Sequence, residues 1–280
     1  MIVYRTKDDL TGHLLSLKNK DLTVGLVPTM GALHAGHASL VERAAFENDL
    51  VIVTIFVNPT QFNDPSDLEH YPRTLDQDLE LLRSLRADLV FVPSVREMYP
   101  GKDTQTFDLG GLDRVMEGAY REGHFNGVAQ IVSKFFLMIH PDRAYFGQKD
   151  FQQLVIVRRL VNILNLDLSV VSCPIIREKD GLAMSSRNVR LSKEERKLAP
   201  FIYETLVKAR EQKLTLSPEQ VKEWVRLRFL EQPLMRLEYF EIVEDKGLTS
   251  IQTWDEKVNK VGCLAVHLGK VRLIDNLYFD

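Results

Sequence analysis

The residues of this sequence best suited to chemistry are two histidines, His34 and His37, with Gly36 between them. They follow the apolar run 23–27 and a turn, and the apolar spacing after them predicts that a helix begins here. Free backbone N–H groups and the dipole at a helix start favour phosphate, and the two imidazoles would share one helical face. The absent side chain at Gly36 would let an anion approach the backbone. The motif therefore indicates a nucleotide-phosphate site rather than a metal site, although it could also be an ordinary helix cap.

A second segment of this character is Met184-Ser185-Ser186-Arg187, which follows a predicted strand and turn. Arginine supplies fixed hydrogen-bond donors to paired oxygens, and serine hydroxyls adapt to either role. Alone, the segment could be an ordinary polar loop. Together with the two histidines it predicts that a triphosphate is held from two sides.

Composition restricts the possible ligands. The chain has 280 residues, 45% of them hydrophobic and 27% charged, with a formal net charge of −3. This balance exerts no general attraction on nucleic acid or on an anionic membrane, so a small phosphorylated ligand is the better expectation. The longest apolar run, 50–57, is too short to span a bilayer, and the N-terminal residues lack an apolar signal, so a cytoplasmic protein without membrane or nucleic-acid partners is expected. Cys173 and Cys263 have no neighbours at metal-ligand spacing and are predicted to be buried.

The elements that must position these residues alternate along the first part of the chain. Strands are predicted near 23–27, 50–57, 89–92, 144–146 and 168–176, with helices near 37–47, 74–86, 126–139 and 150–165. Such alternation is typical of an α/β domain with a mainly parallel sheet flanked by helices. Phosphate sites in such sheets form at the carboxyl ends of the strands.

The pattern changes after residue 176. Helices are predicted near 193–212 and 218–230, and strands near 236–243, 261–267 and 270–274. This pattern favours a smaller α+β domain over 177–280, which follows a first domain over 1–176. The polar segment 177–181 would be the hinge of a lid.

Five segments resemble, in order, the signatures of one known family. They are PTMGALHAGH at 28–37, IFVNPTQF at 55–62, YPRT at 71–74, FGQKDFQQ at 146–153 and GLAMSSRN at 181–188. In this order they are similar to those of the pantothenate synthetases, which are pantoate–β-alanine ligases. The resemblance implies a nucleotidyltransferase-type Rossmann-like fold, a homodimer, and use of ATP and Mg²⁺. It also implies condensation of pantoate with β-alanine through a pantoyl-adenylate, with release of AMP and pyrophosphate.

The same resemblance implies roles for individual residues. Those acting on the ATP phosphates would be His34, His37, Lys149, Ser185, Ser186 and Arg187. The nucleoside would meet Met30, Gly147, Asp150, Ile176 and Met184. Pantoate or β-alanine would meet Asn58, Gln61, Gln153 and His124, and Asp78 would bind the metal. Gln153 is preferred to Gln152 by the family pattern alone, and segment 121–127 resembles a mobile loop with glycine hinges.

Each of these residues also has an ordinary structural interpretation. Lys149 and His124 could be surface groups, Asp78 could lie on a solvated helix face, and the methionines could be core residues. A nucleotidylyltransferase would share the two histidines, but it would need a basic pocket for its second phosphate. Amide side chains stand at the matching positions Asn58, Gln61 and Gln153. An RNA-linked adenylating protein is disfavoured by the acidic balance and by the lack of a basic aromatic face.

Overall fold

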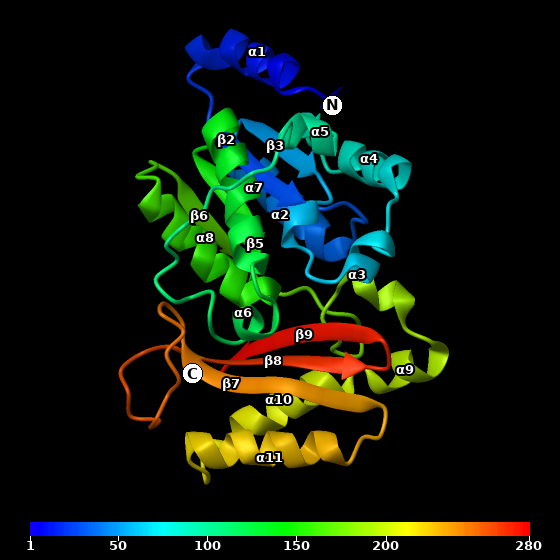
Figure 1. Cartoon of the computed structure of the whole chain (residues 1–280), viewed down its shortest axis with the longest axis vertical. Helices are drawn as coiled ribbons and strands as arrows, with labels where there is room; N and C mark the ends of the chain where they lie inside the picture. The colour runs from blue at the N-terminus through cyan, green and yellow to red at the C-terminus, as the bar shows by residue number, and fades with distance from the viewer.

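The computed structural model describes residues 1–280, apart from the side chain of Asn19. Its larger sheet has six parallel strands in the order β1-β4-β3-β2-β5-β6 (Figure 1). The strands are β1 (Ile2–Tyr4), β2 (Val24–Thr29), β3 (Leu50–Ile55), β4 (Leu89–Phe91), β5 (Arg143–Gly147) and β6 (Ser169–Cys173). After β2 the chain adds β3 and β4 on one side, and it then returns to place β5 on the other side of β2. The order therefore reverses between β2 and β5, and in open α/β sheets ligands bind at such a switch point.

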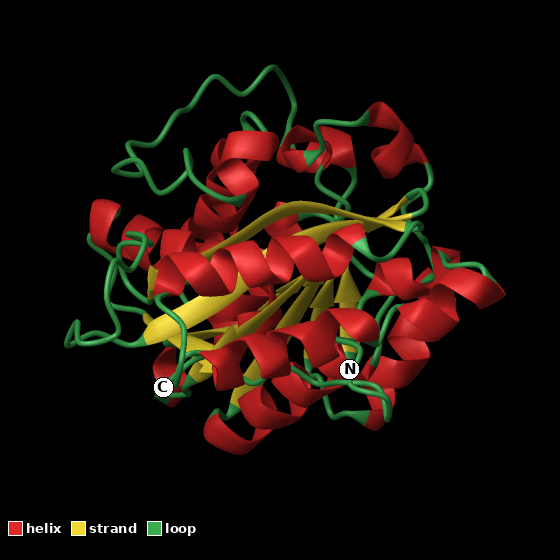
Figure 2. Cartoon of the chain, turned by 90° about the horizontal axis from the view of Figure 1, so that it is seen from below, coloured by secondary structure: helices red, strands yellow, loops and turns green.

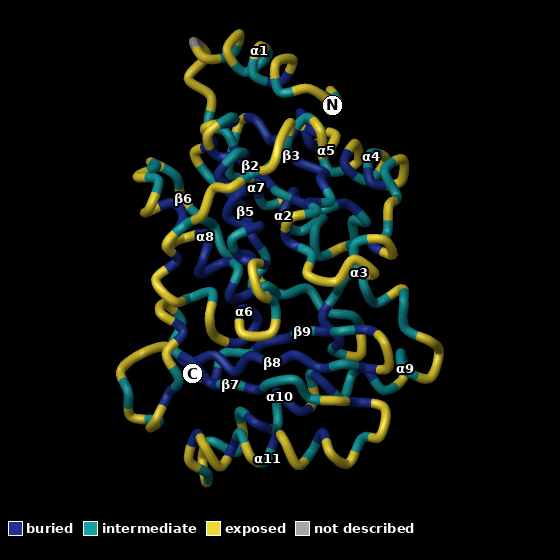
Figure 3. The backbone as a smooth tube through the Cα atoms, viewed as in Figure 1, coloured by how far each residue is buried: buried dark blue, intermediate teal, exposed yellow. Residues whose placement is uncertain are grey.

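Helices cover both faces of this sheet (Figure 2). On one face α1 (Lys7–Leu17), α7 (His124–Ile139) and α8 (Phe151–Ile163) pack on Leu26, Ile52 and Phe91. On the other, α2 (Ala35–Glu47) and α4 (Leu75–Ser84) pack on Val27, Val53 and Val90. Neighbouring residues of one strand thus face opposite cores, as the two-residue repeat of a strand requires. The central strands are apolar throughout because both of their faces are buried (Figure 3).

Short helices occupy the connections. They are α3 (Pro65–Glu69), α5 (Val95–Met98) and α6 (Glu117–Tyr120), with the 3₁₀ turns η1 (Lys18–Lys20), η2 (Pro59–Gln61), η3 (Gln148–Asp150) and η4 (Ser186–Arg190). Three of these turns, η2, η3 and η4, border the site described below.

The C-terminal part contains an antiparallel sheet in the order β7-β8-β9. Its elements are α9 (Lys193–Leu198), α10 (Phe201–Gln212), α11 (Pro218–Leu230), β7 (Met235–Glu244), β8 (Lys260–Leu268) and β9 (Val271–Tyr278). One face of this sheet packs on the helices (Figure 1). On the other side, Val261 and Cys263 share a core with Met116 and Phe151. The small sheet is therefore joined to the larger domain by buried apolar contacts, and the domain boundary near residue 176 remains a prediction.

The predicted fold class is confirmed, with corrections to three element bounds. The single helix predicted over 193–212 was wrong, because α9 ends at Leu198 and α10 begins only at Phe201. Pro200 lies between them and lacks the N–H that a continuous helix would need there. The strand predicted over 168–176 ends earlier, at Cys173, and the final strand extends to Tyr278.

Both cysteines are free and buried, as predicted. Among the residues that the structure describes, no helix combines the length and the apolar character needed to cross a membrane.

Candidate functional site

An open cleft lies at the carboxyl ends of β2 and β5, and its empty space of about 1150 Å³ includes open solvent. Most of the predicted site residues line it: Met30, His34, His37, Asn58, Gln61, Gly147, Lys149, Asp150, Gln153, Ile176, Met184, Ser185 and Arg187. The structure thus brings segments separated by about 150 residues of chain to one place. Ser186, His124 and Asp78 lie outside this cleft.

The two histidines form the start of α2. The Nδ1 atom of His34 accepts the Gly36 N–H at 3.1 Å, and Nδ1 of His37 accepts the His34 N–H at 3.4 Å. Their ring centroids are 4.1 Å apart. Since both Nδ1 lone pairs are engaged, the proton of each neutral ring is assigned to Nε2. The helix cap therefore leaves each histidine with an Nε2–H donor for a ligand.

Burial keeps both imidazoles neutral. It lowers the pKa of His34 from 6.5 to about 4, with a further contribution from the charge of Lys149. Burial likewise lowers the pKa of His37 to about 3, and His34 adds to this effect. In the ligand-free protein at pH 7 the pair therefore contributes hydrogen-bond donors, while positive charge comes from Lys149 and Arg187.

Gly36 has a structural role in addition to the approach of an anion, which stays a prediction. A Cβ atom there would lie 2.8 and 2.9 Å from Cε1 and Nδ1 of the His34 ring. Carbon atoms do not come that close without displacement of one of them. The glycine therefore allows His34 to fold back over its own helix as a cap.

Lys149 and Asp150 belong to η3, the turn directly after β5. The Lys149 ammonium lies 3.0 Å from Oδ1 of Asp150. Partial burial would raise the pKa of Asp150, but the charges of Lys149 and Arg187 hold it below its ordinary value. The Asp150 carboxylate is 46% exposed and stays ionised, so it can accept hydroxyl hydrogen bonds from a sugar.

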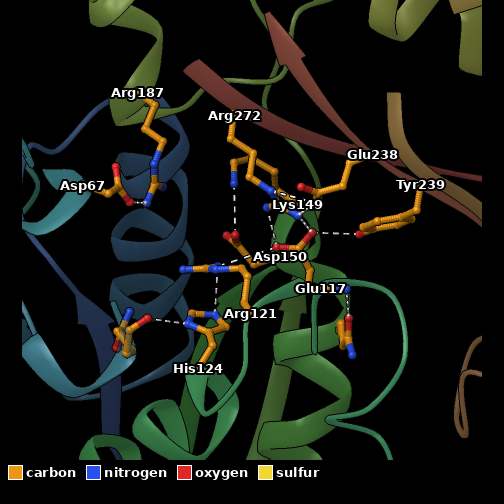
Figure 4. Close-up of polar contacts among 12 residues, drawn as sticks. Asp67, Glu117, Arg121, His124, Lys149, Asp150, Arg187, Glu238, Tyr239 and Arg272 are labelled. Carbon is orange, nitrogen blue, oxygen red and sulfur yellow. Dashed lines mark hydrogen bonds and ion pairs between the residues drawn. The ribbon is translucent and has the colours of Figure 1, made fainter. Parts of the chain in front are cut away.

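The segment Ser185–Arg187 contacts the loop that precedes His34. Ser186 Oγ donates to the Ala32 carbonyl at 3.0 Å, and Ser185 Oγ accepts the Arg187 N–H at 3.2 Å. The Arg187 guanidinium pairs with Asp67 of α3 at 2.7 Å (Figure 4). Asp67 also pairs with Arg190 at 2.8 Å. Nothing in the sequence pattern singled out Asp67, because an acidic residue in a short polar helix has no distinctive spacing.

Asn58 is almost fully buried, and its hydrogen-bonding groups are taken by the protein. Its amide nitrogen donates to Gln61 Oε1 and to the Gly127 carbonyl, both at 3.0 Å. Its oxygen accepts the Tyr99 hydroxyl at 2.8 Å. This arrangement engages the carbonyl end of the Gln61 amide and leaves its NH₂ group near Met30 Sδ at 3.1 Å, on the cleft wall. Asn58 therefore orients Gln61 as a hydrogen-bond donor toward the cleft. The sequence pattern did not indicate that Tyr99 supports Asn58.

The register of α8 distinguishes the two neighbouring glutamines. Gln153 lines the cleft. Gln152 is buried, accepts the Glu117 N–H at 2.9 Å and donates to the carbonyls of Leu112 and Val115. The structure thus places the predicted glutamine at the cleft, and its contact with substrate stays a prediction.

A second, smaller cavity adjoins the cleft. It shares Lys149, Asp150 and Gln153 with the cleft and is also lined by Arg121 and His124. His124 is buried rather than a surface group. Its Nδ1 lies 2.7 Å from the Gln61 carbonyl and its Nε2 lies 3.0 Å from Arg121 Nη1 (Figure 4).

The predicted loop 121–127 is largely the first turn of α7. A Cβ atom on Gly127 would lie 2.3 Å from the Thr60 carbonyl oxygen. Gly127 therefore allows α7 to pack closely on η2, and its role as a hinge stays a prediction.

Asp78 supports the loop that precedes His34. It is only 2% exposed. Its Oδ2 accepts the Ala32 N–H at 2.9 Å, and its Oδ1 accepts the Leu33 N–H at 2.8 Å and the Thr74 hydroxyl at 3.1 Å. Among the described residues, no three or more His, Cys, Asp or Glu side chains are grouped to bind a metal. The metal-binding role of Asp78 therefore stays a prediction.

The buried histidines predict acid sensitivity. Burial lowers the pKa of His124 to about 3, as it lowers those of His34 and His37 to about 4 and 3. An unfolded histidine titrates near 6.5, so below that pH the unfolded chain binds more protons, and stability is lost as the pH falls toward 4. Urea unfolding is expected to show an uptake of about three protons near pH 5 from this source.

The control for this measurement is His140→Asn, at an exposed position after α7. This variant should leave the pH dependence unchanged, whereas His124→Gln should reduce the uptake by about one proton. Equal stability of the unsubstituted protein at pH 7 and pH 5 would contradict the expectation.

Comparison with known proteins identifies the family of the chain. A sequence model described as "Pantoate-beta-alanine ligase" matches residues 2–278. Two curated relatives are named pantothenate synthetase. The one from Porphyromonas gingivalis is 50% identical over all of both chains, and the one from Bacteroides fragilis is 53% identical over 100% of this chain and 99% of the relative.

Solved structures agree as well. A pantothenate synthetase from Thermus thermophilus has a TM-score of 0.91 at 42% identity and covers 100% of this chain and 99% of its own. A pantoate-beta-alanine ligase from Francisella tularensis, described as complexed with "Beta-gamma ATP and Beta-alanine", has a TM-score of 0.83 at 35% identity, with coverages of 100% and 98%. These matches confirm the family that the sequence motifs predicted.

Proposed function

This chain belongs to the pantoate–β-alanine ligase family, and from this premise we propose that it joins the two substrates through a pantoyl-adenylate formed from ATP. The observation that carries the proposal is the convergence on one cleft of three segments whose side chains can donate hydrogen bonds or carry positive charge. His34 and His37 lie at the start of α2, Lys149 lies in η3, and Ser185 and Arg187 lie at the start of η4. Such a site can surround a triphosphate on several sides.

In the first step, a carboxylate oxygen of pantoate attacks the α-phosphorus of ATP. A new P–O bond forms, the bond to the bridging oxygen breaks, and pyrophosphate leaves with the electron pair. Negative charge grows on the departing phosphates, where Lys149, Arg187 and the histidine Nε2–H donors can stabilise it. No covalent nucleophile on the enzyme is needed, because the chemistry depends on alignment and electrostatics.

In the second step, the amine of β-alanine attacks the acyl carbon. A C–N bond forms, the acyl C–O bond to AMP breaks, and the amine loses a proton. Pantoate would be held by Gln61, whose NH₂ group faces the cleft, and by Gln153. We place β-alanine in the cavity beside His124, because that cavity meets the cleft at Gln153.

The described side chains do not form a cage for a divalent cation, so Mg²⁺ would enter with ATP. Mg²⁺ commonly keeps water and phosphate oxygens as ligands and takes one or two carboxylates. Asp78 already accepts three hydrogen bonds, which leaves it little capacity for an ion. The homodimer and the cytoplasmic location, both implied by the family, are also part of the proposal.

A nucleotidylyltransferase acting on a phosphorylated acceptor is the alternative. Beside these three segments the cleft presents the amides of Gln61 and Gln153, and Asn58 lies behind Gln61. Neutral amides suit the hydroxyl and carboxylate groups of pantoate better than a second phosphate.

The test supplies ATP, Mg²⁺, pantoate and β-alanine and measures the products. Equal amounts of AMP, pyrophosphate and pantothenate are expected. Isotope exchange between pyrophosphate and ATP should require pantoate and should not respond to RNA or to phosphorylated acceptors. Release of ADP and phosphate, or exchange that proceeds without pantoate, would overturn the proposal.

A further inference from the structure

The last strand of the small sheet reaches the turn that carries Lys149. Asn276, in β9, is 4% exposed. Its amide nitrogen donates to the Gln148 carbonyl at 2.8 Å and to the Lys149 carbonyl at 3.0 Å. Both hydrogens of that amide are therefore used to hold η3, from more than 120 residues away in the sequence.

The neighbours of Asn276 hold its backbone in place. Asp275 is buried and forms a two-point ion pair with Arg177, at 2.6 and 2.9 Å. An Asp275 oxygen also accepts the Asn276 N–H at 2.8 Å. Arg177 donates to the Asn276 carbonyl at 3.2 Å, and its guanidinium lies 3.7 Å from the centre of the Tyr203 ring. The Asn276 side chain is thus presented to η3 from a rigid support.

The turn η3 has little internal support. No side chain caps it or the start of α8 that follows it. Three residues of 3₁₀ turn have weak hydrogen-bond geometry of their own. The path of this turn decides where the Lys149 ammonium lies, so contacts to its carbonyls act on that ammonium.

We propose that Asn276 is a positioning residue, which clamps the Gln148–Asp150 turn so that Lys149 reaches a bound nucleotide. The inference rests on the proposed function in taking ATP as the ligand. The C-terminal sheet then takes part in the site, because a displacement of β9 would displace Lys149.

Equilibrium binding of ATP tests this clamp in a double-mutant cycle. Asn276→Ala is expected to weaken ATP binding about 10-fold, less than the roughly 10²-fold that a 1 Å misplacement can cost in rate. In a Lys149→Met background the same change should weaken binding less than about 2-fold, because a contact that acts through Lys149 has then lost its target. A substitution that only disturbs the fold would cost the same in both backgrounds.

Two further variants complete the test. Asn259→Ala removes an exposed amide that donates to Asp245 at 2.9 Å, and it should leave ATP binding unchanged. Asn276→Ser keeps one hydrogen-bond donor, so its affinity for ATP should lie between those of the alanine variant and the unsubstituted protein. This variant also provides the test if the alanine variant folds poorly. Unchanged ATP binding in folded Asn276→Ala or Asn276→Ser, or equal losses in the two backgrounds, would overturn the clamp.

The pantoate-dependent exchange assay of the unsubstituted protein separates the two proposals. A protein that binds ATP but shows no such exchange would contradict the reaction. The binding cycle would still decide the role of Asn276.

Discussion

Replacing Lys149 with methionine is expected to lower the rate of pantoyl-adenylate formation by about 10²-fold or more. The ammonium is one of the few cations on the cleft wall, because burial leaves His34 and His37 neutral at pH 7. Methionine keeps the length and the apolar stem of the side chain but cannot stabilise charge on the departing pyrophosphate. The measurement is the rate of pantoate-dependent isotope exchange between pyrophosphate and ATP.

The matched control is Lys134→Met. Lys134 lies on α7, pairs with Asp103 at 2.9 Å and does not line the cleft. The control variant should keep its exchange rate, and both variants should unfold at similar urea concentrations. An exchange rate within about 3-fold of normal in folded Lys149→Met would reject the role of this residue, since such a change corresponds to well under 1 kcal/mol.

Replacing Arg272 with methionine is expected to destabilise the protein by about 3 kcal/mol at pH 7. Its guanidinium contacts both oxygens of Glu117, at 2.7 and 2.8 Å, and Glu238 at 2.9 Å (Figure 4). Tyr239 also donates to Glu117 at 2.9 Å. Both carboxylates are at most 10% exposed, so removal of the arginine leaves two buried negative charges with too little compensation. Urea unfolding at pH 7 measures the loss.

The loss should depend on pH with a definite sign. Burial would raise the pKa of Glu117 and of Glu238, but Arg272 holds both below 4.5. The stabilisation from this network is therefore present above pH 4.5 and is lost as the pH falls below it. In Arg272→Met the carboxylates can protonate, so the difference from the unsubstituted protein should shrink as the pH approaches 4.

The control for this substitution is Arg226→Met. Arg226 pairs with Glu223 on the exposed side of α11, where ion pairs contribute little to stability. This variant should unfold at the same urea concentration as the unsubstituted protein. Equal losses of unfolding free energy in the two variants would contradict the importance of burial at Arg272.

Much of the fold, and the set of residues predicted to meet ATP phosphates, follow from the sequence alone. The alternation of apolar runs with helical spacing determines a parallel sheet, because these periodicities are local properties of the chain. The histidine pair at a helix start indicates a phosphate site because cap, dipole and side-chain donors come from adjacent residues. The family motifs extend this prediction to the residues that line the cleft.

Only the tertiary structure decided which side chains face the cleft and which hold others in place. Asn58 and Gln61 are three residues apart, yet one is enclosed by Tyr99 and Gly127 while the other faces the cleft. Asp67 and Asn276 were not identifiable in advance, since their partners lie more than 100 residues away in the chain. Sequence spacing records neighbours along a helix or strand, whereas contacts of this kind exist only once two sheets and their connections have packed together.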